Sequence, residues 1–160
     1  YQPVQKEPSQ TLISTSTPPS VSQVSTTTAA TYRNDEWRFE FEYPKNWKLE
    51  ENSFYSPFSK FNLQGDSSAE NYNPFRPPLL LNIVTLDFAS RAVISFKNLN
   101  ARTSVVTIAG VRGIKYEYEF EGTTQTGIDL PFGEYRMILG TEKQYEDVFN
   151  QIIASFKFLK

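Results

Sequence analysis

Residues 107–120 read TIAGVRGIKYEYEF, and this stretch decides the fold class. Within residues 114–120, apolar and aromatic side chains alternate with Lys and Glu, a period of two that is typical of a β-strand with one buried face. The preceding residues 103–108 are rich in β-branched side chains, which also favours a strand. Ala109 and Gly110 form the turn between the two segments. The stretch therefore predicts an antiparallel hairpin.

Further strands are expected on both sides of this hairpin. Residues 37–43 read WRFEFEY, with the aromatic side chains on one side and the charged ones on the other. Residues 79–86 read LLLNIVTL, an apolar run that suits a central strand covered on both faces. Short strands are also predicted from Trp47 and after Phe156. A last strand over residues 134–139 follows a segment that we expect to be a loop, because it contains Gly122, Gly127, Pro131 and Gly133.

One helix is predicted near the C-terminus. Its apolar residues recur at spacings of three and one, which places them in a single stripe. They are Tyr145, Val148, Phe149, Ile152, Ile153 and Phe156. Thr141 and Gln144 have the spacing of a capping box and predict the start of this helix. Residues 88–99 fit either a helix or a strand. Together these elements predict an α+β fold, an antiparallel β-sheet with the C-terminal helix packed on one face.

The first 31 residues differ in composition from the rest of the chain. Ser, Thr, Pro and Gln occupy 21 of these 31 positions, and only Lys6 and Glu7 are charged. Such a segment buries too little apolar surface to offset the entropy of ordering it. We therefore expect a disordered linker over residues 1–31, with a flexible span on the order of 30 Å, and a globular domain over residues 32–160.

A Ser/Thr/Pro-rich spacer also bears on location. Spacers of this kind are typical just outside a membrane anchor or a processed leader. We expect an extracytoplasmic protein of the cell envelope, tethered to the membrane by an anchor upstream of residue 1, as in a lipoprotein. A linker between two cytoplasmic domains is the alternative interpretation.

The composition excludes several kinds of chemistry. The 160 residues include no Cys and no His, which rules out disulfides, thiolate zinc sites and a Ser/His/Asp triad. The 16 Lys and Arg nearly balance the 18 Asp and Glu, and the basic residues are scattered, so no nucleic-acid partner is expected. Gly110 and Gly113 lack the Lys and Ser or Thr of a phosphate-binding loop and suit a turn and a close-packed strand start instead. We predict no cofactor, and a monomeric domain.

Three stretches resemble the PsbP-like family. They are YPKNW at residues 43–47, the hairpin at residues 107–120, and YEDVFNQIIASFKFL at residues 145–159. The resemblance covers residues 32–160, and the family's fold is shared by PsbP, Ran-binding Mog-type proteins and many bacterial membrane-anchored lipoproteins. It implies an α/β/α sandwich around an antiparallel sheet, and members that act as assembly or binding factors and not as catalysts. No functional residue carries over from it.

Two pairs of glutamates are candidates for a carboxylate site. Glu40 and Glu42 share one side of their strand, and Glu117 and Glu119 share one side of theirs. If these strands were neighbours, the carboxylates would form an acidic patch that could bind a cation or serve as acid and base. This is the basis of the alternative function, a carbohydrate-active or metal-dependent hydrolase. The interpretation we favour is the solvated face of a sheet.

The loop over residues 53–78 is the preferred candidate for a binding surface. Its aromatic residues lie among Ser, Asn, Gly and Pro without a regular period, and one arginine could add directional hydrogen bonds. The candidate residues are Phe54, Tyr55, Phe58, Phe61, Tyr72, Phe75 and Arg76. Such rings can form a stacking platform for a protein or a cell-envelope glycan, or they can fold back and fill gaps at the sheet edge. The first functional hypothesis is therefore a non-enzymatic binding or assembly module.

Oxygen-bearing side chains also alternate within this loop. They are Asn62, Gln64, Asp66, Ser68 and Glu70. Calcium is bound by oxygen ligands of this kind, but the glycine stands at Gly65 and the order of an EF-hand loop is not kept. We therefore predict no metal site.

Overall fold

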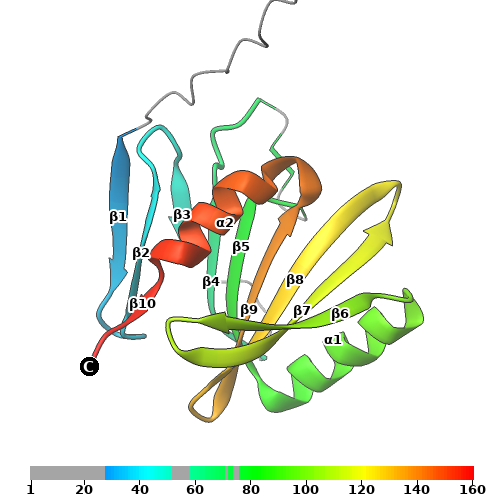
Figure 1. Ribbon diagram of the computed structural model, residues 1–160. Coiled ribbons are helices and arrows are strands. Elements are labelled where there is room, and N and C mark those ends of the chain that lie inside the picture. The colour runs from blue at the N-terminus through cyan, green and yellow to red at the C-terminus, as the bar shows by residue number, and fades with distance from the viewer. Residues whose placement is uncertain (1–27, 52–57, 71, 74–75) are drawn as a thin grey trace, which may run out of the picture.

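The structure is a computed structural model that describes residues 28–51, 58–70, 72–73 and 76–160. Its strands form two antiparallel sheets (Figure 1). The small sheet has the order β1-β2-β10 and contains β1 (Ala29–Asn34), β2 (Phe39–Pro44) and β10 (Lys157–Phe158). The large sheet has the order β3-β4-β5-β9-β8-β7-β6 and contains β3 (Leu49–Glu51), β4 (Ser59–Gly65), β5 (Leu79–Thr85), β9 (Tyr135–Glu142), β8 (Thr123–Phe132), β7 (Val111–Phe120) and β6 (Arg102–Ile108). The helices are α1 (Leu86–Asn98) and α2 (Glu146–Ser155), with a 3-10 turn η1 (Lys143–Tyr145) before α2.

The small sheet has β2 at its centre, and the half-buried strand that the aromatic alternation predicts is confirmed. Phe39 and Phe41 are almost completely buried, whereas Glu42, on the other face of the strand, is exposed. The prediction is wrong about Trp37, because residues 35–38 form the turn between β1 and β2 and the strand begins at Phe39. The first and the last of the described strands meet here, since β1 and β10 flank β2.

The large sheet contains the predicted hairpin. β6 pairs with β7 in the register that places Ile108 opposite Val111, and Ala109 and Gly110 form the turn with positive φ values of 47° and 82°. β5 lies between β4 and β9, which confirms it as a central strand. Gly113 is buried at the start of β7, as expected for a close-packed position.

The segment expected to be a loop before the last long strand is instead strand β8. Thr, Gly and Pro made it unlike a strand in sequence, yet it pairs with β7 along one edge and β9 along the other. Gly127 faces the ring of Phe96 in α1, and a Cβ atom there would lie at an ordinary contact distance of 3.5 Å from that ring. Long-range pairing and a ring packed against the backbone thus override the local sequence signal.

Helix α2 confirms the predicted C-terminal helix, and its residues Phe149 and Ile152 are buried. The predicted capping box is wrong. Thr141 belongs to β9, and its hydroxyl donates a hydrogen bond to the carbonyl of Pro78 at 2.7 Å, while Tyr145 stands at the N-cap position of α2. Strand β9 therefore continues to Glu142, and helix α2 begins later in the sequence, at Glu146, than the capping spacing predicts.

Helix α1 resolves the ambiguous stretch over residues 88–99 and lies on the opposite face of the large sheet from α2. The ring of Phe96 in α1 stacks on Tyr116 at a centroid distance of 4.7 Å. The neighbouring Lys115 instead places its Nζ atom 3.4 Å from Glu146 of α2. Because successive side chains of a strand point to opposite faces, the two helices cover different faces of β7 and its sheet (Figure 1). This is the sandwich that the resemblance implies.

The core lies between the large sheet, α2 and the small sheet. Phe156 stacks on Phe39 and Phe41, with ring centroids 5.5 and 5.7 Å apart. The predicted linker falls mostly on residues 1–27, which lie outside the described residues; β1 begins at Ala29, inside the predicted linker boundary. Over the described ranges, neither helix has the length and apolar character needed to cross a bilayer.

Candidate functional site

The expectation of a continuous loop over residues 53–78 is wrong, because strand β4 lies within it, and the candidate residues of this segment contact different parts of the domain. Phe54, Tyr55 and Phe75 lie outside the described residues. The ring of Phe58 stacks on Phe88 of α1 at 6.2 Å, and the guanidinium of Arg91 lies 5.4 Å from its centroid. Phe61 packs against the core and contacts Phe39 edge to face at 6.1 Å. The Tyr72 hydroxyl donates to the side chain of Gln64 in β4.

Arg76 joins the loop to the turn between β7 and β8. Its guanidinium forms an ion pair with Glu121 and lies 3.8 Å from the carboxylate of Glu142. It also lines a small hollow of about 150 Å³ between α1 and the sheet, together with Phe96 and Tyr118. Among the described candidates, Phe58, Phe61, Tyr72 and Arg76 therefore each have a separate structural partner, and the stacking platform remains a prediction.

The glutamates considered as a carboxylate site do not come together. Their strands, β2 and β7, belong to different sheets, so the condition for a shared acidic patch is not met. Glu40 lies 3.4 Å from Arg33 and 3.6 Å from Lys157, and Glu117 lies 3.3 Å from Lys115. These ion pairs are typical of a charged sheet face.

The alternating oxygen-bearing residues are also divided by the fold. Asn62 and Gln64 are buried in β4, whereas Ser68 is exposed and its hydroxyl donates to Asp66 at 3.0 Å. Over the part of the chain that the structure describes, no three His, Cys, Asp or Glu side chains are grouped as metal ligands.

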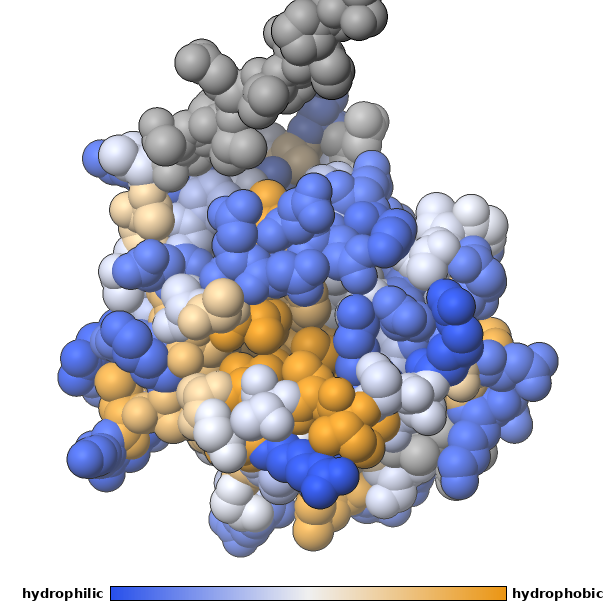
Figure 2. Space-filling view, viewed as in Figure 1, coloured by the Kyte–Doolittle hydropathy of each residue, from blue (hydrophilic) through white to orange (hydrophobic). Residues whose placement is uncertain are grey.

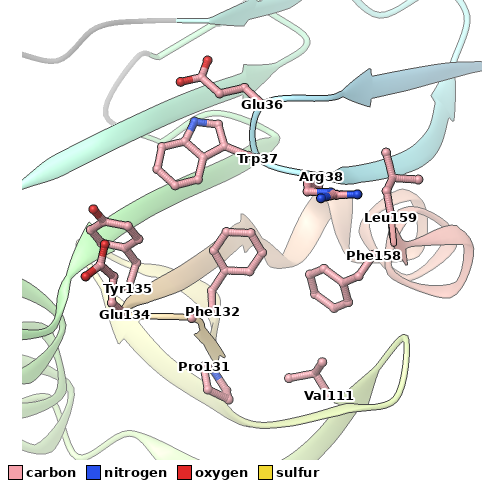
Figure 3. Close-up of a pocket in the computed structure, with 11 residues that line it drawn as sticks. Glu36, Trp37, Arg38, Val111, Pro131, Phe132, Glu134, Tyr135, Phe158 and Leu159 are labelled. Atoms are coloured by element: carbon pink, nitrogen blue, oxygen red, sulfur yellow. The ribbon is translucent and has the colours of Figure 1, made fainter.

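A hollow larger than the one beside Arg76 lies where three turns meet the C-terminal strand. We call it the turn pocket, and its volume is about 530 Å³. It is lined by Glu36, Trp37 and Arg38 of the β1–β2 turn, Val111 after the β6–β7 turn, Pro131, Phe132, Gly133, Glu134 and Tyr135 around the β8–β9 turn, and Phe158 and Leu159 at the end of β10. Figure 3 shows these side chains arranged around one opening.

Hydrogen bonds donated by backbone amides hold the β1–β2 turn and the C-terminal segment of this pocket. The amide of Trp37 donates to Asn34 Oδ1 at 2.8 Å, which closes the β1–β2 turn. The amide of Leu159 donates to the carbonyl of Arg38 at 2.8 Å and fixes the C-terminal segment beside that turn. Arg38 has a φ of 55° and Gly133 a φ of 58°, so both turns use the left-handed region. The pocket is thus built from fixed backbone.

Aromatic rings form most of the pocket wall. Trp37 meets Tyr135 edge to face at a centroid distance of 5.7 Å and an angle of 80°, and it lies 6.2 Å from Phe132. Phe132 in turn lies 5.9 Å from Phe158. All four rings are half-buried, so they pack against one another while part of each stays accessible.

The charges of the turn pocket are divided between two sides. Glu36 and Glu134 lie on the side of Trp37 and Tyr135, and Arg38 lies toward Phe158 (Figure 3). Both glutamates are exposed, and no Lys or Arg of the described residues forms an ion pair with either. A hydrogen bond to the Glu134 carboxylate raises the pKa of Tyr135.

A second apolar area is visible on the molecular surface. On the face shown in Figure 2, apolar side chains gather between α2 and the β6–β7 hairpin, while the outer side of α2 is hydrophilic. The β6–β7 hairpin also borders the turn pocket through Val111.

The residues of the turn pocket were not predicted as a site. The sequence pattern predicts Trp37 on the core side of a strand and Pro131 in a loop. The one usable signal was an aromatic residue beside each of two turns, at Trp37 and at Phe132, but no local pattern indicates that these turns meet in space.

The sequence matches no family model and no curated protein. Solved structures do resemble the fold. Cyanobacterial PsbP (CyanoP) from Synechocystis is 12% identical, with a TM-score of 0.51 over 85% of this chain and 95% of that one. A protein of Bacteroides thetaiotaomicron is 18% identical, with a TM-score of 0.41 over 81% of this chain and 48% of that one. LpqN, involved in cell envelope biogenesis of Mycobacterium tuberculosis, is 15% identical, with a TM-score of 0.40 over 83% and 86%.

The likeness to CyanoP defines the class of structure. The chain has a PsbP-like α+β fold, which confirms the resemblance drawn from residues 43–47, 107–120 and 145–159. At this low identity the likeness concerns the fold alone, and the function is argued from the turn pocket.

Proposed function

We propose that this chain is a non-enzymatic binding or assembly module of the cell envelope that engages a protein partner through the turn pocket. The observation that carries the proposal is the set of half-buried rings of Trp37, Phe132, Tyr135 and Phe158 around one open hollow. Large apolar side chains that stay accessible at a concave surface are the usual anchors of a binding site.

The wall of the pocket favours a protein partner over a glycan. Trp, Tyr and Arg are the residues most enriched at the energetic centres of protein interfaces. Here they stand beside the aliphatic side chains of Val111, Pro131 and Leu159. A sugar ring needs a flat exposed ring face with several hydrogen-bonding groups around it, whereas this mixture of ring edges and aliphatic groups suits apolar side chains of a protein.

The ion pairs of the sheet support a non-enzymatic role. Glu40 and Glu117 belong to separate sheets and are each paired with basic side chains, so they offer no converging pair of acids. The carboxylates that do lie near a pocket, Glu36 and Glu134, are exposed at its rim. General acid and base catalysis depends on carboxyl groups held in distinct, partly desolvated environments.

The composition of the N-terminal residues supports the proposed location. Residues 1–31 have the Ser/Thr/Pro/Gln content of a spacer outside a membrane anchor. β1 begins at Ala29 on the edge of the small sheet, so such a spacer would leave the domain from the sheet edge. A tether at that point would leave the turn pocket free, because the pocket lies at the other end of β1, beyond Asn34.

A selection experiment tests the proposal. Peptides from a random displayed library are selected on the whole chain and then measured on single variants. We expect Trp37→Ala and Phe132→Ala to weaken binding at least tenfold, which corresponds to about 1.4 kcal/mol. The matched control is Phe120→Ala, because Phe120 is 43% exposed at the opposite end of β7, about 30 Å from Val111. Peptides that bind all three variants as well as the native chain would refute the proposal.

A further inference from the structure

We propose that the partner places a basic side chain, preferably an arginine, against Trp37 and Tyr135 between the carboxylates of Glu36 and Glu134. This inference rests on the proposed function and names the chemistry of the partner at the same site. The carboxylates and the two rings lie on one side of the turn pocket, and Arg38 lies on the other (Figure 3).

The rings provide the first half of the argument. Trp is the best aromatic receptor for a cation, and a guanidinium or ammonium group is attracted when it lies within about 6 Å of the ring centroid. Trp37 and Tyr135 meet at 80°, so they form a corner whose two walls are both aromatic. A flat guanidinium can stack on one wall while its N–H groups point past the other.

The carboxylates provide the second half. Glu36 and Glu134 border the same corner, and no basic side chain of the described residues neutralises them. Most other acidic groups near the sheets do have such partners, as Glu40 has in Arg33 and Lys157. Two carboxylates beside an aromatic corner attract a cation from the partner and repel an acidic side chain.

Arg38 determines the orientation in which a partner segment can bind to the turn pocket. It lies toward Phe158 and Leu159, beyond the ring of Phe132. A partner segment with a basic group at one end and an apolar or acidic group at the other therefore fits in one orientation, because the reverse orientation would place its cation beside Arg38.

Three short blocked peptides serve as probes: Leu-Arg-Leu, Leu-citrulline-Leu and Leu-Glu-Leu. Citrulline has nearly the shape of arginine without the charge. Each peptide is titrated into the 15N-labelled whole chain, and the indole N–H signals of Trp37 and Trp47 are followed by NMR. Trp47 is an internal control, because it packs against the core and does not line the turn pocket. We expect the arginine peptide to shift the Trp37 signal with an affinity about three- to tenfold higher than the citrulline peptide.

Charge variants complete the test. In the double variant Glu36→Gln and Glu134→Gln, the preference for the arginine peptide over the citrulline peptide should decrease to the part that the rings contribute, whereas Arg38→Gln should keep the full preference. The preference should also decrease at high salt, since the charges are exposed. Equal affinities for arginine and citrulline, with the Trp37 signal still shifting, would overturn this inference and leave the proposed function standing. If no peptide shifts the Trp37 signal, both proposals fail.

Discussion

The ring of Trp37 meets the ring of Tyr135 edge to face, with centroids 5.7 Å apart, although Trp37 lies in a turn of the small sheet and Tyr135 begins strand β9 of the large sheet. This contact joins the β1–β2 turn to the start of β9. Both side chains are half-buried, so the contact holds the small sheet against the large one and leaves part of each ring accessible. The turn pocket depends on this junction.

The half-buried position of Trp37 predicts that removing its ring destabilises the fold only moderately. Trp37→Ala should lower the free energy of unfolding by about 1–2 kcal/mol, because part of its ring already faces solvent. Phe39→Ala, two residues along the chain and completely buried, should cost about 3–5 kcal/mol. Urea denaturation of both variants measures the difference. An equal cost for the two would mean that Trp37 serves the core and not a binding surface.

Gly113 should tolerate no side chain. A Cβ atom there would lie 2.4 Å from Leu130 Cδ2 and 2.5 Å from the carbonyl oxygen of Asp129, and that backbone oxygen cannot move aside. We expect Gly113→Ala to lower the free energy of unfolding by about 2 kcal/mol or more. Gly140→Ala is the matched control, since its nearest neighbours would lie at 3.6 Å and beyond. Thermal unfolding of the two variants should separate them; similar melting temperatures would contradict the packing described for β7.

Glu146 should contribute stability that depends on pH. A hydrogen bond from Lys143 is the main cause that lowers the pKa of Glu146 below its usual value of 4.5. Because the folded pKa is the lower one, the stabilisation is complete above pH 4.5 and is lost as the pH falls through the lowered value. Glu146→Gln should therefore cost about 1 kcal/mol at pH 7, from the ion pair and the start of helix α2.

Urea denaturation at several pH values tests this dependence. The stabilities of native chain and Glu146→Gln should converge at acid pH, and Lys143→Met should behave in the same way. A constant difference between native chain and variant over the whole range would show that the Glu146 carboxylate has no such effect.

Replacing only one partner of the ion pair between Asp129 and Arg136 should destabilise the fold more than replacing both partners. The Arg136 Nε atom lies 2.8 Å from Asp129 Oδ1, and the Asp129 side chain is only 8% exposed. Arg136→Met leaves a buried carboxylate without its ion-pair partner and should cost about 3 kcal/mol. The double variant Asp129→Leu and Arg136→Met should cost less than Arg136→Met alone. In a double-mutant cycle, simple additivity of the two substitutions would argue against this coupling.

Local patterns predict those parts of the fold in which one segment carries its own signal. The alternation in residues 114–120 and the apolar stripe from Tyr145 to Phe156 give β7 and α2 directly. β8 could not be predicted in this way, because Gly127 and Pro131 resemble loop residues until Phe96 and the neighbouring strands are in place. The start of α2 was misplaced because Thr141 donates its hydroxyl hydrogen bond to Pro78, far away in sequence.

The candidate site depends on contacts that no single segment encodes. The aromatic residues of the 53–78 loop drew attention because they lack a period, yet Phe61 lies against the core and Tyr72 bonds to β4. The sequence pattern does not mark Trp37 and Phe132 as a site, because Trp37 continues the alternation of residues 37–43 and Phe132 lies in a segment that is predicted to be a loop. They become a site only when the register of two sheets brings their turns to the same place.

The most direct test of the central claim is to map, by NMR on the 15N-labelled whole chain, where a selected peptide binds. We predict that the Trp37 indole signal and the amide signals of Phe132 and Phe158 shift together, while the Trp47 indole signal stays in place. The opposite result, with shifts at Tyr72 and Arg76 and none at Trp37, would place binding at the 53–78 loop and contradict the assignment of the turn pocket.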